Sequence, residues 1–182
     1  MEVAMIKKSG PSEPALITAA LDSLTTLNII LPSSGEVKTK AKPQMMFDYA
    51  TNPNYQPDDE FLQLLGSDQN IQNDFTIMLQ NISHQFMPRV AAASTGSIDI
   101  REIDGFKLKF LQSKAQAEQI YIVIEMQETD DPPGMLFIKE PKGSIKRVTL
   151  PKFSNGRVQL LFDVHDPDLI ALRNINSEVF II

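Results

Sequence analysis

Residues 119–127 constrain the fold most, because they are the strongest β-strand signal in the sequence. β-Branched and aromatic side chains, which favour extended backbone, fill most of this stretch. One face of such a strand carries the residues at even positions, which are Ile120, Ile122, Ile124 and Met126. Tyr121 and Val123 make the opposite face apolar as well. A strand of this kind usually lies inside a sheet that is covered on both faces. We therefore expect a central strand whose second face is covered by the N-terminal region or by another molecule.

A hairpin is predicted upstream of this strand, around an Asp-Gly pair. A two-residue turn would place the apolar residues of its two strands on opposite faces of the sheet. A three-residue loop, with its glycine in the left-handed conformation, instead pairs Ile100 with Leu108 and Ile98 with Phe110. The pattern therefore favours the three-residue loop at residues 103–105.

The C-terminal third repeats this pattern. Strands are expected at 135–138, 145–150, 158–164 and 178–182. A three-residue loop at 154–156 would set Leu150 against Leu160 and Val148 against Phe162. Asp166 followed by Pro167 is typical of a helix N-cap with proline in the first turn, so a short helix is predicted over 169–173.

The N-terminal half has helical periodicity. Helices are predicted at 12–31, 58–66 and 68–87, the last with an apolar stripe suited to cover a sheet. The other side of the 68–87 helix is amide-rich and carries few charges, and it holds Asn70, Gln72, Asn73, Gln80, Asn81, Ser83, His84 and Gln85. That face either meets solvent or packs against something polar.

Residues 32–57 are proline-rich and polar, so they are predicted to be a linker. The linker holds an apolar cluster, which a solvated linker does not need: Met45, Met46, Phe47, Tyr49 and Tyr55. Either the segment lies along the domain surface or it is a motif that docks on another protein.

The predicted fold is α+β, with N-terminal helices followed by an antiparallel β-meander of about six or seven strands. A long helix packs on one face of the sheet. We expect an N-terminal region (1–57) with a helix and a proline-rich linker, followed by an α+β domain (58–182).

Composition and missing motifs argue against several classes of function. The 182 residues carry 17 basic and 23 acidic side chains, a net charge of −6, which argues against a general nucleic-acid binder. The absence of cysteine excludes thiolate metal sites, iron–sulfur clusters and a cysteine nucleophile. The sequence shows no secretory signal and no membrane-spanning run, so we expect a cytoplasmic protein. It also lacks the nucleophile-elbow, phosphate-loop and dinucleotide-binding motifs, so an enzyme has little support.

Two surface clusters provide alternatives. Asp163, His165 and Asp168 lie within six residues and offer the ligands of a divalent metal site for a hydrolase. The competing interpretation makes the two aspartates an exposed strand residue and a residue of the first helical turn. Basic residues in 139–157 suit either phosphate contacts or protection of an edge strand, and they are Lys139, Lys142, Lys146, Arg147, Lys152 and Arg157.

The function expected from these patterns is a non-catalytic protein-binding or assembly component, such as an adaptor or chaperone-like protein. Its expected binding surfaces are the 43–55 linker and the amide-rich face of the 68–87 helix. We expect no cofactor, another protein as partner, and a homo-oligomer rather than a monomer. The alternatives are the metal-assisted hydrolase and a nucleic-acid-binding module that uses the basic hairpins.

Overall fold

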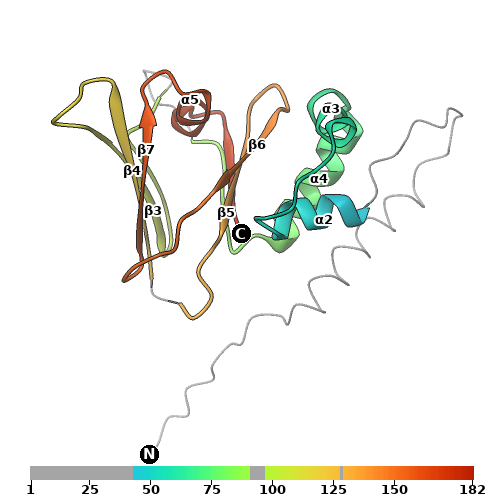
Figure 1. Ribbon diagram of the computed structural model, residues 1–182, viewed down its shortest axis with the longest axis horizontal. Coiled ribbons are helices and arrows are strands. Elements are labelled where there is room, and N and C mark those ends of the chain that lie inside the picture. The colour runs from blue at the N-terminus through green and yellow to red at the C-terminus, as the bar shows by residue number, and fades with distance from the viewer. Residues whose placement is uncertain (1–42, 91–96, 128) are drawn as a thin grey trace, which may run out of the picture.

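The computed structural model describes residues 43–90, 97–127 and 129–182, and these form three layers. Helices make the first layer, a four-stranded antiparallel sheet makes the second, and another four-stranded antiparallel sheet makes the third (Figure 1). The α+β class with antiparallel sheets is therefore confirmed. The helix predicted at 12–31 lies outside the described residues.

The helical layer consists of α2 (Pro43–Thr51), α3 (Asp59–Ser67) and α4 (Gln69–Ile82). Aspartates at the N-caps start the last two helices, because the carboxylate of Asp58 accepts the amide of Phe61 and that of Asp68 accepts two amides of α4. The apolar sides of all three helices pack on the middle sheet, in a cluster that includes Met135, Phe137 and Phe180.

Two predictions for this layer were wrong. Residues 43–51 are a helix with buried apolar residues, so the folded body includes part of the segment predicted as a linker. The helix predicted at 68–87 ends at Ile82, and the chain continues as a short strand. This happens because Phe86 and Met87 pair with the C-terminal strand, which offers backbone partners that a longer helix would not use.

The middle sheet has the order β1-β8-β5-β6 and the outer sheet the order β2-β3-β4-β7. The middle strands are β1 (Gln85–Met87), β5 (Met135–Lys139), β6 (Ile145–Thr149) and β8 (Glu178–Ile181). The outer strands are β2 (Ile100–Ile103), β3 (Phe106–Gln112), β4 (Gln119–Met126) and β7 (Arg157–Asp163). The strand predicted to be central is β4, and it lies between β3 and β7 as expected.

The two sheets face each other across a shared core. Ile120, Ile122 and Ile124 of β4 point into this core together with Leu136 and Ile138 of the middle sheet. Helix α5 (Pro167–Arg173) packs at one end of it, and its N-cap is Asp166 with proline in the first turn, as predicted. Among the described residues, no helix is long and apolar enough to cross a membrane.

The strands do not form one meander, because the chain changes sheet four times: between β1 and β2, between β4 and β5, between β6 and β7, and between β7 and β8. The pairs predicted between 148–150 and 160–162 are therefore wrong, since β6 pairs with β5 and β7 pairs with β4. The loop directly before β7 is a two-residue turn in which Asn155 and Gly156 both have positive φ, and Ser154 faces Arg157. Asn-Gly adopts this turn readily, which explains why a three-residue loop does not form.

The first hairpin also has a two-residue turn, and Ile103 faces Phe106 across it. Gly105 has the expected positive φ, but the predicted pairing of Ile100 with Leu108 is wrong. Arg101 faces Leu108 instead and points into the core, whereas Ile100 points outward. The reason is that backbone carbonyl groups inside the protein bind the Arg101 guanidinium group.

Candidate functional site

The outer face of the β2-β3-β4-β7 sheet carries a row of apolar side chains. Leu111 of β3 pairs with Tyr121 of β4, which in turn pairs with Leu161 of β7. Leu111 is 47% exposed and Leu161 is 50% exposed, while Tyr121 between them is half-buried. We call these three residues the apolar row.

A second row lies beside the first along the strands. It contains Ile100, Lys109, Val123 and Gln159 in register, and Ile100 is exposed like the leucines of the apolar row. Val123 is only 2% exposed, although it belongs to neither of the two hydrophobic clusters. Its cross-strand neighbours, Lys109 and Gln159, have side chains long enough to cover it.

A third row is charged, and its charges neutralise one another. Lys107 lies 2.8 Å from Glu102, and Glu125 lies 2.6 Å from Lys109 and 3.7 Å from Arg157. The hydrogen bond from Lys109 is the main reason why the pKa of Glu125 lies below its usual value. The face as a whole therefore has little net charge to select an oppositely charged partner.

No helix or strand of the described residues lies over this face. Figure 1 shows β3, β4 and β7 at the side of the molecule away from α2, α3 and α4, with nothing labelled beyond them. Six large hydrophobic side chains are exposed among the described residues, and three of them lie on this face: Ile100, Leu111 and Leu161. This concentration distinguishes the face from singly exposed apolar residues, which are normal on any protein.

The apolar cluster predicted at 45–55 is not an exposed patch. Met46 and Tyr49 are buried in the helix–sheet core, and Met45, Phe47 and Tyr55 pack partly buried against it. Arg147 of β6 holds the segment in place, because its guanidinium group stacks 4.3 Å from the Tyr49 ring centroid and donates to the Tyr55 carbonyl at 3.2 Å. Burial also raises the pKa of Tyr49.

The amide-rich side of α4 is divided between the interior and the surface. Gln72 is buried, and its side chain lies against Gly143 in the loop between β5 and β6. Asn70, Asn73 and Gln80 are exposed. The buried glutamine thus has a local packing role rather than a place on a polar binding surface.

The structure does not assemble a metal site from Asp163, His165 and Asp168. The Asp163 carboxylate accepts the His165 amide at 2.8 Å, and Asp168 lies 3.6 Å from Lys146. Across the three described ranges, no group of three acidic or histidine side chains is arranged to hold a metal ion. These residues organise the turn that starts α5.

Most cations predicted as a basic patch are engaged within the protein. Lys139 pairs with Glu178, Lys146 with Glu140 and Asp168, and Arg157 with Glu125. Arg147 binds backbone carbonyls, as described above. Side chains committed in this way are poorly suited to contact phosphates.

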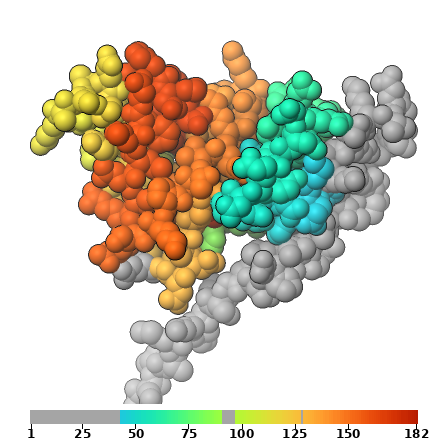
Figure 2. All heavy atoms as spheres, in the orientation of Figure 1, coloured from blue at the N-terminus to red at the C-terminus, as the bar shows by residue number. Residues whose placement is uncertain are grey.

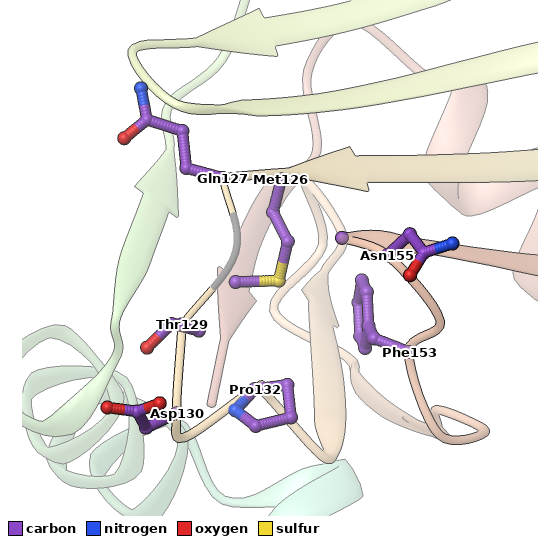
Figure 3. Close-up of a pocket in the computed structure, with 8 residues that line it drawn as sticks. Met126, Gln127, Thr129, Asp130, Pro132, Phe153 and Asn155 are labelled. Atoms are coloured by element: carbon purple, nitrogen blue, oxygen red, sulfur yellow. The ribbon is translucent and has the colours of Figure 1, made fainter.

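A cavity of about 550 Å³ opens at the end of the sandwich near the last residue of β4. Figure 3 shows Met126 and Phe153 pointing into it, with Thr129, Asp130, Pro132 and Asn155 around the rim. The lining of a neighbouring cavity of about 340 Å³ includes His84, which lies between α4 and β1. Asp130 is the one ionisable side chain among the described residues that line the 550 Å³ cavity, so these residues do not supply a pair of acid and base.

Sequence reasoning missed the apolar row, although a signal was present. Leu111 and Leu161 lie at odd-numbered positions of their strands, on the side opposite to the core-facing residues, and the predicted pairing of β6 with β7 concealed that relation.

None of the protein-family models, curated proteins or solved structures compared with the chain matches it.

Proposed function

We propose that this protein is a non-catalytic binding or assembly component, and that its protein partner docks on the outer face of the β2-β3-β4-β7 sheet. The observation that supports this most is the apolar row of Leu111, Tyr121 and Leu161 on the outer sheet face, where both leucines are exposed. Removing such a row from water is the usual driving force for protein association.

The rest of the face suits a protein partner as well. Aromatic and aliphatic residues in the centre with a polar rim are typical of protein interfaces. The neutralised charged row supplies such a rim, because its lysines and glutamates already pair with one another. From the sequence we expected binding through residues 43–55. We propose the outer sheet face instead, since Met46 and Tyr49 of that segment are buried.

A capture experiment with extracts of the source organism tests the proposal. The full chain is immobilised as wild type, as Leu111→Lys and as Leu62→Lys, with folding checked by circular dichroism. Leu62 is a matched control, because it is 43% exposed but lies on α3 in the helical layer. Leu111→Lys is expected to reduce capture of the wild-type partner by about tenfold or more, since a charge in the centre of an apolar interface costs well over 1.4 kcal/mol.

Leu62→Lys is expected to capture the same protein at the wild-type level. Equal capture by wild type and Leu111→Lys, or no specific capture by wild type, would refute the proposal. Cross-linking of the face to residues 1–42 of the same chain would also refute it, because the occupant would then be internal.

A further inference from the structure

The two sheets expose four edge strands, and three of them are protected against pairing with another chain. Strand β1 has three residues and β2 has four, so both offer little backbone. Strand β6 carries Lys146 and Arg147 in its centre. Short strands and central cations are the usual protection of sheet edges. Strand β7 has seven residues, and its charges, Arg157 and Asp163, lie only at its ends.

The free backbone groups of β7 can be identified from its pairing. The amide of Met126 donates to Gly156 and that of Val164 donates to Glu118, so the even-numbered residues of β7 bond with β4. The backbone groups of Gln159, Leu161 and Asp163 therefore point away from the sheet. In the described parts of the chain, Gln159 and Leu161 have no backbone partner on that side. Figure 1 shows β7 in front of β4, at the near edge of the sheet.

Other parts of the chain occupy the edge of β7 before Gln159 and after Asp163. Arg157 exchanges two backbone hydrogen bonds with Ser154, which occupies the edge at that end. At the other end the chain turns, because the amide of Asp166 donates to the Asp163 carbonyl. The open edge is therefore five residues long, from Gln159 to Asp163. The orange and red surface on the near side of Figure 2 contains this part of the chain.

We propose that β7 of a second copy of this chain adds to this edge in antiparallel orientation, with the two-fold axis at Leu161. Leu161 then faces Leu161 of the other copy, and Gln159 of each copy faces Asp163 of the other. The Leu161 pair forms two main-chain hydrogen bonds. In each outer pair the Asp163 amide donates to the Gln159 carbonyl, while the Asp163 carbonyl already accepts the Asp166 amide of its own chain. This inference goes beyond the proposed function, since it needs no other protein and concerns the edge of the sheet rather than its face.

The side chains favour a second copy over an unrelated strand. In this register two exposed leucines meet, which removes apolar surface from water. The Gln159 amide meets the Asp163 carboxylate, whose Oδ1 accepts the His165 amide and whose Oδ2 can accept the glutamine. The strand of the other copy ends at Asp163 and turns before it reaches Ser154. Pairing also joins the two apolar rows into one.

The mass of the purified full chain, measured by light scattering at micromolar concentrations, tests this dimer. Wild type is expected at twice the chain mass of 20.4 kDa. Leu161→Lys and Leu161→Glu are each expected to weaken the dimer by about tenfold or more, because like charges then face each other at the axis. An equimolar mixture of these two variants is expected to restore a dimer of one copy of each.

Leu111→Lys is the matched control, because Leu111 lies in the same apolar row but on β3, away from the edge. It is expected to keep the wild-type mass while losing the partner of the capture experiment, so failure of this inference and of the proposed function can be distinguished. A monomeric wild type would overturn the inference, and so would a dimer that Leu161→Lys leaves intact or that Leu111→Lys dissociates. Hydrogen exchange gives a second readout, in which the amides of Leu161 and Asp163 become protected only as concentration rises.

Discussion

Arg101 is a charged side chain in an apolar core, and carbonyl oxygens rather than carboxylates bind it. Its Nε donates to Leu172 at 2.7 Å, Nη1 donates to Ser177 at 3.1 Å, and Nη2 donates to Asn174. Two of these carbonyls belong to the end of α5, where the helix dipole favours a positive charge. Burial lowers the pKa of Arg101 to about 10, which still leaves it protonated at neutral pH.

Replacing this arginine is expected to be strongly destabilising. Arg101→Leu leaves three carbonyl groups without their charged donor, so the free energy of unfolding should fall by about 3 kcal/mol in urea denaturation. Arg157→Leu is the control, because Arg157 is largely exposed and its ion pair with Glu125 is 3.7 Å long. Its effect is expected to stay within about 0.5 kcal/mol. Equal effects of the two substitutions would contradict the role assigned to Arg101.

Arg101 also shows where prediction from sequence failed at this scale. The predicted pairing of Ile100 with Leu108 put Ile100 on the core face, so Arg101, the next residue of the strand, fell on the outer face, where arginines usually lie. Its partners are carbonyl groups more than 70 residues away, and no local pattern reveals backbone acceptors at such a distance. The helix caps at Asp58, Asp68 and Asp166 depend on neighbouring residues alone, which explains why the sequence predicted those helix starts.

At the scale of elements, the loop between β5 and β6 meets α4 through a glycine. Gly143 has a φ of +95°, and a Cβ atom there would overlap the Gln72 side-chain oxygen. Gly143→Ala is therefore expected to lower the free energy of unfolding by about 1–3 kcal/mol. Combining it with Gln72→Ala should recover only the part caused by overlap, since the backbone strain remains.

Gly66 in α3 is the matched control for Gly143. A methyl group added at Gly66 would meet no atom of a neighbouring element within 4 Å, and the helical backbone there is one that alanine adopts. Gly66→Ala is expected to stabilise the protein by about 0.5–1 kcal/mol, because alanine favours helix. If Gly143→Ala were as well tolerated as Gly66→Ala in denaturant titrations, the close approach of the loop to α4 would be wrong.

The charged row of the outer sheet predicts a dependence on pH. The pKa of Glu125 is lower in the folded protein than its usual value, mainly through the hydrogen bond from Lys109. At acid pH the unfolded chain then binds more protons than the folded chain. The contribution of Glu125 to stability is therefore present above its usual pKa and is lost as the pH falls through the lower, folded value.

Denaturant midpoints of wild type and Glu125→Gln between pH 7 and pH 3 measure this contribution. Wild type is expected to have the higher midpoint at pH 7, and the difference should shrink as the pH falls. A difference that stays constant over this range would show that the ion pair with Lys109 adds nothing to stability.

Strand existence was largely predicted from sequence, whereas strand partners were not. The pattern of residues 119–127 identified β4 as a central strand, because apolar residues on both faces are visible in the sequence itself. The connection from β6 to β7 has the glycine turn of a hairpin, yet the two strands lie in different sheets. Residues 154–157 form the turn by themselves, so the turn does not require β6 and β7 to pair. The sequence pattern does not show that the segment between β6 and this turn crosses from the middle sheet to the outer sheet.

At the scale of the whole molecule, the two sheets have four faces, and one of these faces, which is partly apolar, has no cover from the described residues. The helices cover the middle sheet, and the two sheets cover each other through the shared core. The outer face of β4 was predicted to need a cover, and the odd positions of Leu111 and Leu161 put them on the outer faces of their own strands, but strand partners are needed to align them with Tyr121. Their alignment depends on the register of three strands that are far apart in the chain.

The most direct test of the account asks what touches this face in the source organism. A photoreactive amino acid replaces Leu111, and the control chain carries it at Leu62, which is similarly exposed on α3. Irradiation is expected to join the chain labelled at position 111 to another protein, identified by mass spectrometry, while the label at position 62 gives no such product. The same products from both positions, or products at position 111 that contain only residues of the same chain, would contradict the claim that the outer sheet binds a protein partner.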